Sequence, residues 1–136
     1  MHVIENSSEY LSVIFSGSVD QDHLFQALRE IFIHPEYPVK NSVWVFEGCE
    51  CDFSNISMFE LLRMVKAYYP REATRKKTAI VTSTSLHHAM AQMFCKEAEH
   101  SALEFTLQAF NNRPEAEAWY KETGSLGNGG WIEKFL

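Results

Sequence analysis

An unbroken apolar run, Val43-Trp44-Val45-Phe46, is the feature that most constrains how this chain can fold. Four consecutive β-prone apolar residues predict a strand that is covered on both faces of a sheet. The pattern breaks at Gly48, and the spacing of Ser57 and Glu60 then predicts a helix that begins with a capping box. In such a box the Ser57 hydroxyl accepts from the Glu60 amide, and the Glu60 carboxylate accepts from the Ser57 amide. A buried strand, a polar loop and a helix start together often form a binding site in α/β proteins.

Strand-like and helix-like segments alternate along the rest of the chain. Strands are expected at residues 2–5, 9–16, 43–46, 78–82 and 103–109. Apolar stripes at helical spacing are found at residues 24–32, 61–69, 86–94 and 116–120. Gly17 is expected to end the second strand and Gly124 the last helix. The alternation of apolar and polar residues at 103–109 predicts a strand near an edge of the sheet.

This order predicts an α/β fold with about five strands and about four helices. The sheet is expected to be mixed but mostly parallel, and to open with a β-hairpin, because strand–helix–strand connections need right-handed crossovers. Residues 1–124 are expected to form a single domain, followed by a tail at residues 125–136.

Composition excludes several classes of function. A formal net charge of −6 argues against a nucleic-acid partner. The chain holds no apolar run of the roughly 18 residues that an integral membrane segment needs. The first residues lack the features of a secretory signal peptide, and the three cysteines are an odd number at uneven spacing. These features predict a cytoplasmic protein with reduced thiols.

Several local features are similar to those of one known superfamily. They are the opening hairpin, the Gly17 junction, the run at 43–46, Ala79-Ile80-Val81 before a Met-rich helix, and the closing segment 114–119. In these features residues 2–122 resemble the STAS superfamily, and most of all its small bacterial SpoIIAA-like branch, which is also grouped with Sec14-like domains. The resemblance implies a SpoIIAA-like fold and a non-enzymatic regulatory module that binds a protein partner. The Sec14-like grouping implies an alternative function, the carriage or sensing of a small apolar or lipid-like ligand.

In the resembled family, a phosphorylatable serine lies in an Asp-Ser-Ser-Gly motif at the start of the second helix. This chain matches the motif at Asp52 and Ser54, but Phe53 and Asn55 depart from it. Hydroxyl residues are also expected at the end of the neighbouring strand. The candidate contact and phosphorylation residues are therefore Asp52, Ser54, Ser57, Ser83, Thr84 and Ser85. Capping and turn formation explain the same residues without any partner.

A second candidate site is an apolar pocket between helices. The flexible and aromatic side chains that would line it are Met58, Phe59, Met90, Met93 and Phe94. Packing in the ordinary core is the alternative for all five.

No spacing in the sequence indicates a catalytic or metal site. Cys49 and Cys51 lack the second cysteine pair of a typical zinc site, and Cys95 lies on an apolar stripe. We find no phosphate-binding glycine loop, dinucleotide fingerprint or nucleophile elbow. We therefore expect no enzyme activity, no metal and no cofactor.

The tail combines glycines with strongly apolar residues. Residues 127–130 are mostly glycine, and Trp131, Ile132, Phe135 and Leu136 follow. Burial of these side chains would contribute about 1.5–3 kcal/mol each before ordering costs. We expect the tail to be buried, either on its own domain or on a second subunit, which would make the protein a homodimer.

Overall fold

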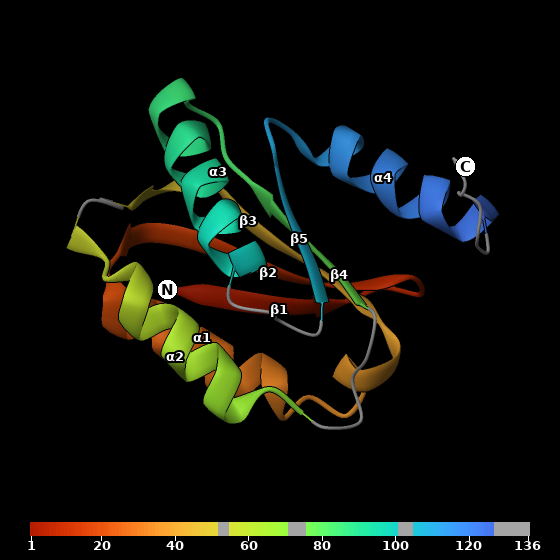
Figure 1. Ribbon diagram of the computed structural model, residues 1–136, viewed down its shortest axis with the longest axis horizontal. Helices are drawn as coiled ribbons and strands as arrows, with labels where there is room; N and C mark the ends of the chain where they lie inside the picture. The colour runs from red at the N-terminus through yellow and green to blue at the C-terminus, as the bar shows by residue number, and fades with distance from the viewer. Residues whose placement is uncertain (52–54, 71–75, 101–104, 127–136) are drawn as a thin grey trace.

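The computed structural model describes residues 1–51, 55–70, 76–100 and 105–126. Within these residues, five strands form one sheet in the order β1-β2-β3-β4-β5. β1 pairs antiparallel with β2, and every later pair is parallel. The expected α/β class, the opening hairpin and the mostly parallel sheet are confirmed (Figure 1). The strands are β1 (His2–Asn6), β2 (Tyr10–Val19), β3 (Asn41–Cys51), β4 (Lys76–Val81) and β5 (Phe105–Phe110).

Within the described residues, three α-helices and one short 3-10 helix lie between strands, and a fourth α-helix follows β5. Asp20 is the N-cap of the first helix, and the His23 ring accepts from the Asp20 amide. None of the helices in the described ranges is long and apolar enough to cross a membrane. The helices are α1 (Gln21–Phe32), η1 (Tyr37–Val39), α2 (Met58–Tyr68), α3 (Ser85–His100) and α4 (Arg113–Leu126).

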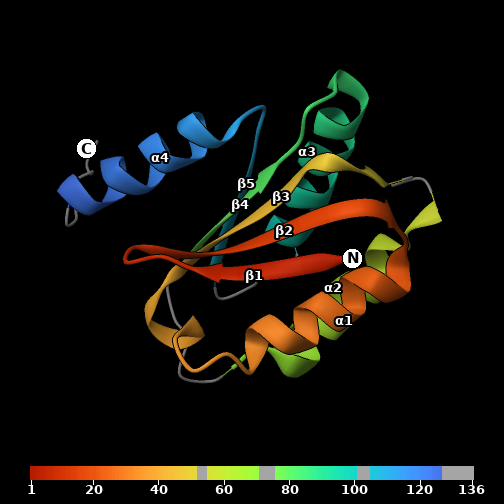
Figure 2. The ribbon, with the colours of Figure 1, turned by 180° about the vertical axis from the view of Figure 1, so that it is seen from behind.

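The helices divide between the two faces of the sheet according to the alternation of side chains along the strands. On β3, Trp44 and Phe46 point to the face covered by α1, α2 and α3. Val43 and Val45 point to the opposite face, where Ala116 of α4 packs. Figure 2 shows α4 on the other side of the sheet from α1 and α2. One sheet therefore separates two cores, one made with three helices and the other with one.

Two strands extend further than the sequence predicts. β2 continues through Gly17, which has a φ of 71°, as far as Val19. β3 continues through Gly48 to Cys51, paired with residues 16–19 of β2. The expected strand ends at Gly17 and Gly48 are therefore wrong. An apolar run in a sequence indicates a buried strand. This extension has no such run, because backbone hydrogen bonds hold together two largely exposed strand ends.

The last helix is also longer than predicted. α4 passes through Gly124 and reaches Leu126, so the expected stop at Gly124 is wrong. A glycine inside a helix costs only about 0.5–1 kcal/mol, which its neighbours can offset. The inner face expected for this helix is confirmed, because Ala116 is buried and Trp119 and Tyr120 pack beside it. The apolar tail at 131–136 lies outside the described residues.

Candidate functional site: an apolar cavity beneath α1, α2 and α3

A cavity of about 110 Å³ lies between the sheet and the three helices on its larger face. β3, β4 and β5 form its floor, and α1, α2 and α3 form its walls. Of the lining residues that the structure describes, only Tyr37, Trp44 and Thr78 carry a polar side-chain atom, and none carries a charge. The lining residues are Leu24, Leu28, Phe32, Tyr37, Trp44, Phe46, Ile56, Met58, Leu61, Val65, Thr78, Ile80, Met90, Ala91, Phe94, Phe105 and Leu107.

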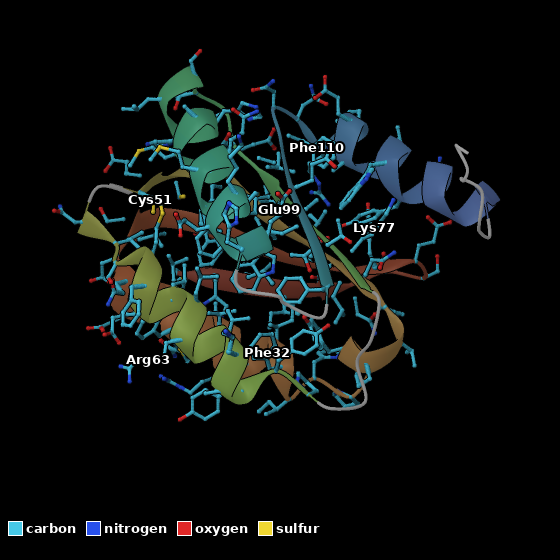
Figure 3. The ribbon with its side chains drawn as sticks, viewed as in Figure 1. Phe32, Cys51, Arg63, Lys77, Glu99 and Phe110 are labelled. Atoms are coloured by element: carbon cyan, nitrogen blue, oxygen red, sulfur yellow. The ribbon has the colours of Figure 1, made fainter. Side chains whose placement is uncertain are left out.

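Large aromatic side chains build the floor of the cavity. Phe46 stacks on Phe15 of β2 with ring centroids 4.7 Å apart, and Phe15 also stacks on Trp44 at 5.8 Å. Phe32 of α1 lies on the same side of the sheet, as Figure 3 shows, and meets Tyr37 at 5.3 Å. Rigid rings fix the floor and one wall, because aromatic pairs prefer defined offset and tilted geometries.

The start of α2 is held by a contact that the sequence did not predict. Ser57 caps the helix, since its hydroxyl accepts from the Glu60 amide at 3.2 Å. The Ser57 amide, however, donates to Gln21 Oε1 of α1 at 2.6 Å, while the Glu60 carboxylate pairs with Arg63. The expected return bond from Glu60 to Ser57 is therefore wrong. The Gln21 contact ties α2 to α1 and so positions Met58 over the cavity.

Two of the three polar side chains of the described lining, Tyr37 and Thr78, are deeply buried. Tyr37 is 2% exposed and Thr78 is 5% exposed. The Oγ atoms of Ser42 and Thr78 lie 3.2 Å apart in a buried hydrogen bond. Burial raises the pKa of Tyr37 far above its ordinary value, and Tyr69 adds to the rise, whereas a hydrogen bond with the Thr78 side chain opposes it. Tyr37 is therefore a neutral hydroxyl at any physiological pH.

The structure divides the five residues predicted for the apolar pocket. Met58, Met90 and Phe94 line the cavity. Phe59 and Met93 do not line it and are 72% and 60% exposed. Successive helical residues are turned by about 100°, so the neighbours of Met58 and Phe94 face away from the cavity.

Most of the lining could not be assigned from the sequence. The apolar residues of α1 and β3 have the same periodic signal whether they fill a core or border a cavity. Tyr37 and Thr78 are far apart in the sequence, and only the pairing of β3 with β4 brings their surroundings together. No local pattern marks them as a pair.

The predicted contact residues lie elsewhere, at the carboxyl edge of the sheet. Ser83, Thr84 and Ser85 are all exposed. Ser83 Oγ donates to the Glu47 carbonyl at 3.5 Å, and Thr84 Oγ1 accepts from the His87 amide at 3.1 Å. Thr84 is thus a helix cap, as Ser57 is. Asp52 and Ser54 lie outside the described residues.

None of the three cysteines, all of them within the described residues, is in a disulfide. Cys49 is half-buried, whereas Cys51 and Cys95 are buried. Burial, with a smaller effect of Glu99, raises the pKa of Cys95 to about 12, so this thiol stays protonated. Figure 3 places Cys51 at the end of β3, beside the start of α2. Among the described residues, no group of three His, Cys, Asp or Glu side chains could hold a metal ion.

The fold and the cavity together define an α/β protein with a mixed five-stranded sheet and an apolar cavity beneath three helices. Among solved structures, the chain is similar to an uncharacterized protein of the DUF3478 family with a SpoIIAA-like fold, from Shewanella loihica PV-4. The TM-score is 0.52 at 13% sequence identity, and the similarity covers 88% of this chain and 92% of that chain. The expected SpoIIAA-like fold is confirmed. No protein-family model and no curated protein gives a significant match.

Proposed function

We propose that this protein is a non-enzymatic binding module that holds a small apolar ligand in the cavity beneath α1, α2 and α3. The observation that carries the proposal is the cavity itself, which has an uncharged and almost wholly apolar lining. Ligand sites in proteins are concave and mostly apolar, with few polar groups.

The energetics of packing support the same conclusion. Protein interiors are close-packed, and voids larger than a water molecule are few. At about 24 cal/mol per Å³, an empty cavity of about 110 Å³ costs on the order of 2–3 kcal/mol. A bound apolar ligand would offset part of this cost, because it would stabilise the folded state alone.

Two tryptophan substitutions on α3 test the proposal. Met90 lines the cavity, and Met93 on the same helix is exposed. We expect small apolar compounds to raise the melting temperature of the unsubstituted protein. Met90→Trp should fill the cavity and abolish this thermal shift. Met93→Trp is the matched control and should keep that shift. If no apolar compound raises the melting temperature, and native mass spectrometry finds none bound after gentle purification, the proposal is wrong.

A second candidate function, a contact site for a protein partner, is favoured by one observation at the carboxyl edge of the sheet. Leu86 is 68% exposed and directly follows the exposed hydroxyl residues at 83–85. An exposed leucine beside hydrogen-bonding groups is the composition of a small protein interface. In a pull-down, Leu86→Ser should release a partner that Met93→Ser retains. If Leu86→Ser retains every partner, this surface is not the contact site.

A further inference from the structure

We propose that the ligand of this cavity carries one neutral polar group, which binds at Tyr37 and Thr78, and that its apolar part extends toward α2 and α3. This inference rests on the proposed function, because it names the chemistry of the molecule that the cavity holds. It follows from the placement of polar atoms in the lining, from the absence of charge among the described lining residues, and from the volume.

Tyr37 and Thr78 are the hydroxyl-bearing residues of the described lining, and they mark its polar end. Both side chains line the cavity and both are buried. Thr78 bonds to Ser42 on β3, the residue to which it is paired across the sheet. A hydroxyl can donate one hydrogen bond and accept two. Thr78 also bonds to Tyr37, and Tyr37 bonds in turn to Tyr69. Each hydroxyl therefore already takes part in two bonds and has one position left for a polar atom of the ligand.

A charged ligand group does not fit this end. None of the described lining residues is a Lys, Arg, His, Asp or Glu. An ionised carboxylate or ammonium that is buried without a partner loses its hydration and gains no ion pair in return. An alcohol, phenol or primary amide loses much less, and the two hydroxyls can replace its hydrogen bonds to water. The cavity therefore selects neutral molecules over acids of the same size.

The exposure of the lining residues indicates how the ligand is oriented in the cavity. Ile56, Met58 and Phe94 are only half-buried, whereas Tyr37 and Thr78 are buried. Phe105 and Leu107 of the edge strand β5 are half-buried as well. The opening therefore lies on the side of α2, α3 and β5, and the polar group enters first. The cavity volume of about 110 Å³ is smaller than the ~150 Å³ engineered cavity that takes benzene, so it encloses no more than about one small ring or short chain. Any longer part of the ligand would extend out through this opening.

Three compounds of similar size separate the contributions of shape, polarity and charge. Phenol presents a hydroxyl, toluene presents a methyl group of similar size, and benzoate presents a charge. We expect phenol to bind about tenfold more tightly than toluene, which is the upper range for one net hydrogen bond. Benzoate should show no saturable binding at neutral pH. Titrations followed by amide NMR shifts give the dissociation constants, and the shifts of residues 77–79 report the location.

Two threonines near each other on the chain supply a matched pair of variants. Thr78→Val removes the cavity hydroxyl and should reduce the preference for phenol over toluene to about twofold or less. Thr82 is also fully buried, lies just beyond β4 and does not line the cavity. Thr82→Val should leave the preference at about tenfold. If Thr78→Val does not fold, Tyr37→Phe takes its place, with the same loss of preference expected.

The outcomes of this experiment test the polar-end inference and the proposed function. Equal binding of phenol and toluene by the original protein would overturn the polar-end inference and leave the apolar binding site standing. Tighter binding of benzoate than of phenol would overturn it as well. Saturable binding of none of the three compounds would overturn the proposed function and the inference together.

Discussion

The two faces of the sheet are packed in different ways, although the same strands supply both. The face toward α1, α2 and α3 carries large side chains such as Phe15, Trp44 and Phe46, and it contains the cavity. The face toward α4 carries mostly small aliphatic side chains such as Val43 and Ala79, with the ring of Phe110 beside them. Large rigid rings cannot adjust to every gap, whereas small residues let a single helix approach closely.

The two faces also differ in where their polar contacts lie. On the α4 face these contacts hold the helix to the sheet: Lys77 Nζ donates to the Trp119 carbonyl at 2.9 Å, and the Tyr120 hydroxyl donates to the Ser42 carbonyl. Figure 3 shows Lys77 on the α4 side. On the other face the side chains of Tyr37 and Thr78 line the cavity, and their hydroxyls bond to each other, with Thr78 also bonded to Ser42. Under the proposed function, the α4 face would serve stability and the cavity face would serve binding.

The largest expected effect is unfolding at alkaline pH, which tests both faces together. Burial raises the pKa of Tyr37 on the cavity face and of Tyr120 on the α4 face above the ordinary value near 10. Groups with a raised pKa keep their full contribution to stability below pH ~10 and lose it as the pH rises further. Circular dichroism should therefore show cooperative unfolding above pH ~10.

Single tyrosine substitutions sharpen this test. Tyr37→Phe and Tyr120→Phe each remove one titrating hydroxyl, and each should reduce the steepness with which the free energy of unfolding falls above pH ~10. Urea titrations at pH 9 and pH 11 measure this change. If only one of the two substitutions has an effect, the faces do not unfold as a single unit.

The division between the faces could be predicted only in part from the sequence. The strands, the helices and the hairpin follow from apolar periodicity and from capping residues such as Ser57. The ends of β2 and β3 were missed, because pairing of exposed backbone leaves no apolar signal. The cavity was predicted at Met58, Met90 and Phe94 but not at Tyr37 or Thr78. Periodicity shows which side of an element is buried, and it does not show whether the space is filled.

A medium effect is expected from enlarging one alanine on each face. Ala116 of α4 is fully buried on the α4 face, and Ala91 of α3 lines the cavity. Ala116→Leu should lower the free energy of unfolding by about 1–3 kcal/mol, because it overpacks a filled core. Ala91→Leu should change it by less than about 1 kcal/mol, because the added carbons enter empty space.

Chemical denaturation of the two alanine variants measures the difference directly. Ala91→Leu should also weaken phenol binding at least fivefold, since it occupies part of the cavity, while Ala116→Leu should not. Equal destabilisation by the two substitutions would contradict the contrast in packing between the faces.

The smallest expected effect concerns a single bond on the α4 face. The hydroxyl of half-buried Tyr10 on β2 donates to Glu117 Oε2 at 2.5 Å, and burial followed by this contact raises the pKa of Tyr10. Glu117→Gln keeps an acceptor but removes its charge, so the free energy of unfolding should fall by no more than about 1 kcal/mol. Phenol affinity should stay within twofold of its original value, because the bond and the cavity lie on opposite faces of the sheet. A tenfold change in phenol affinity would mean that α4 controls the cavity through the sheet, and that the two faces are not independent.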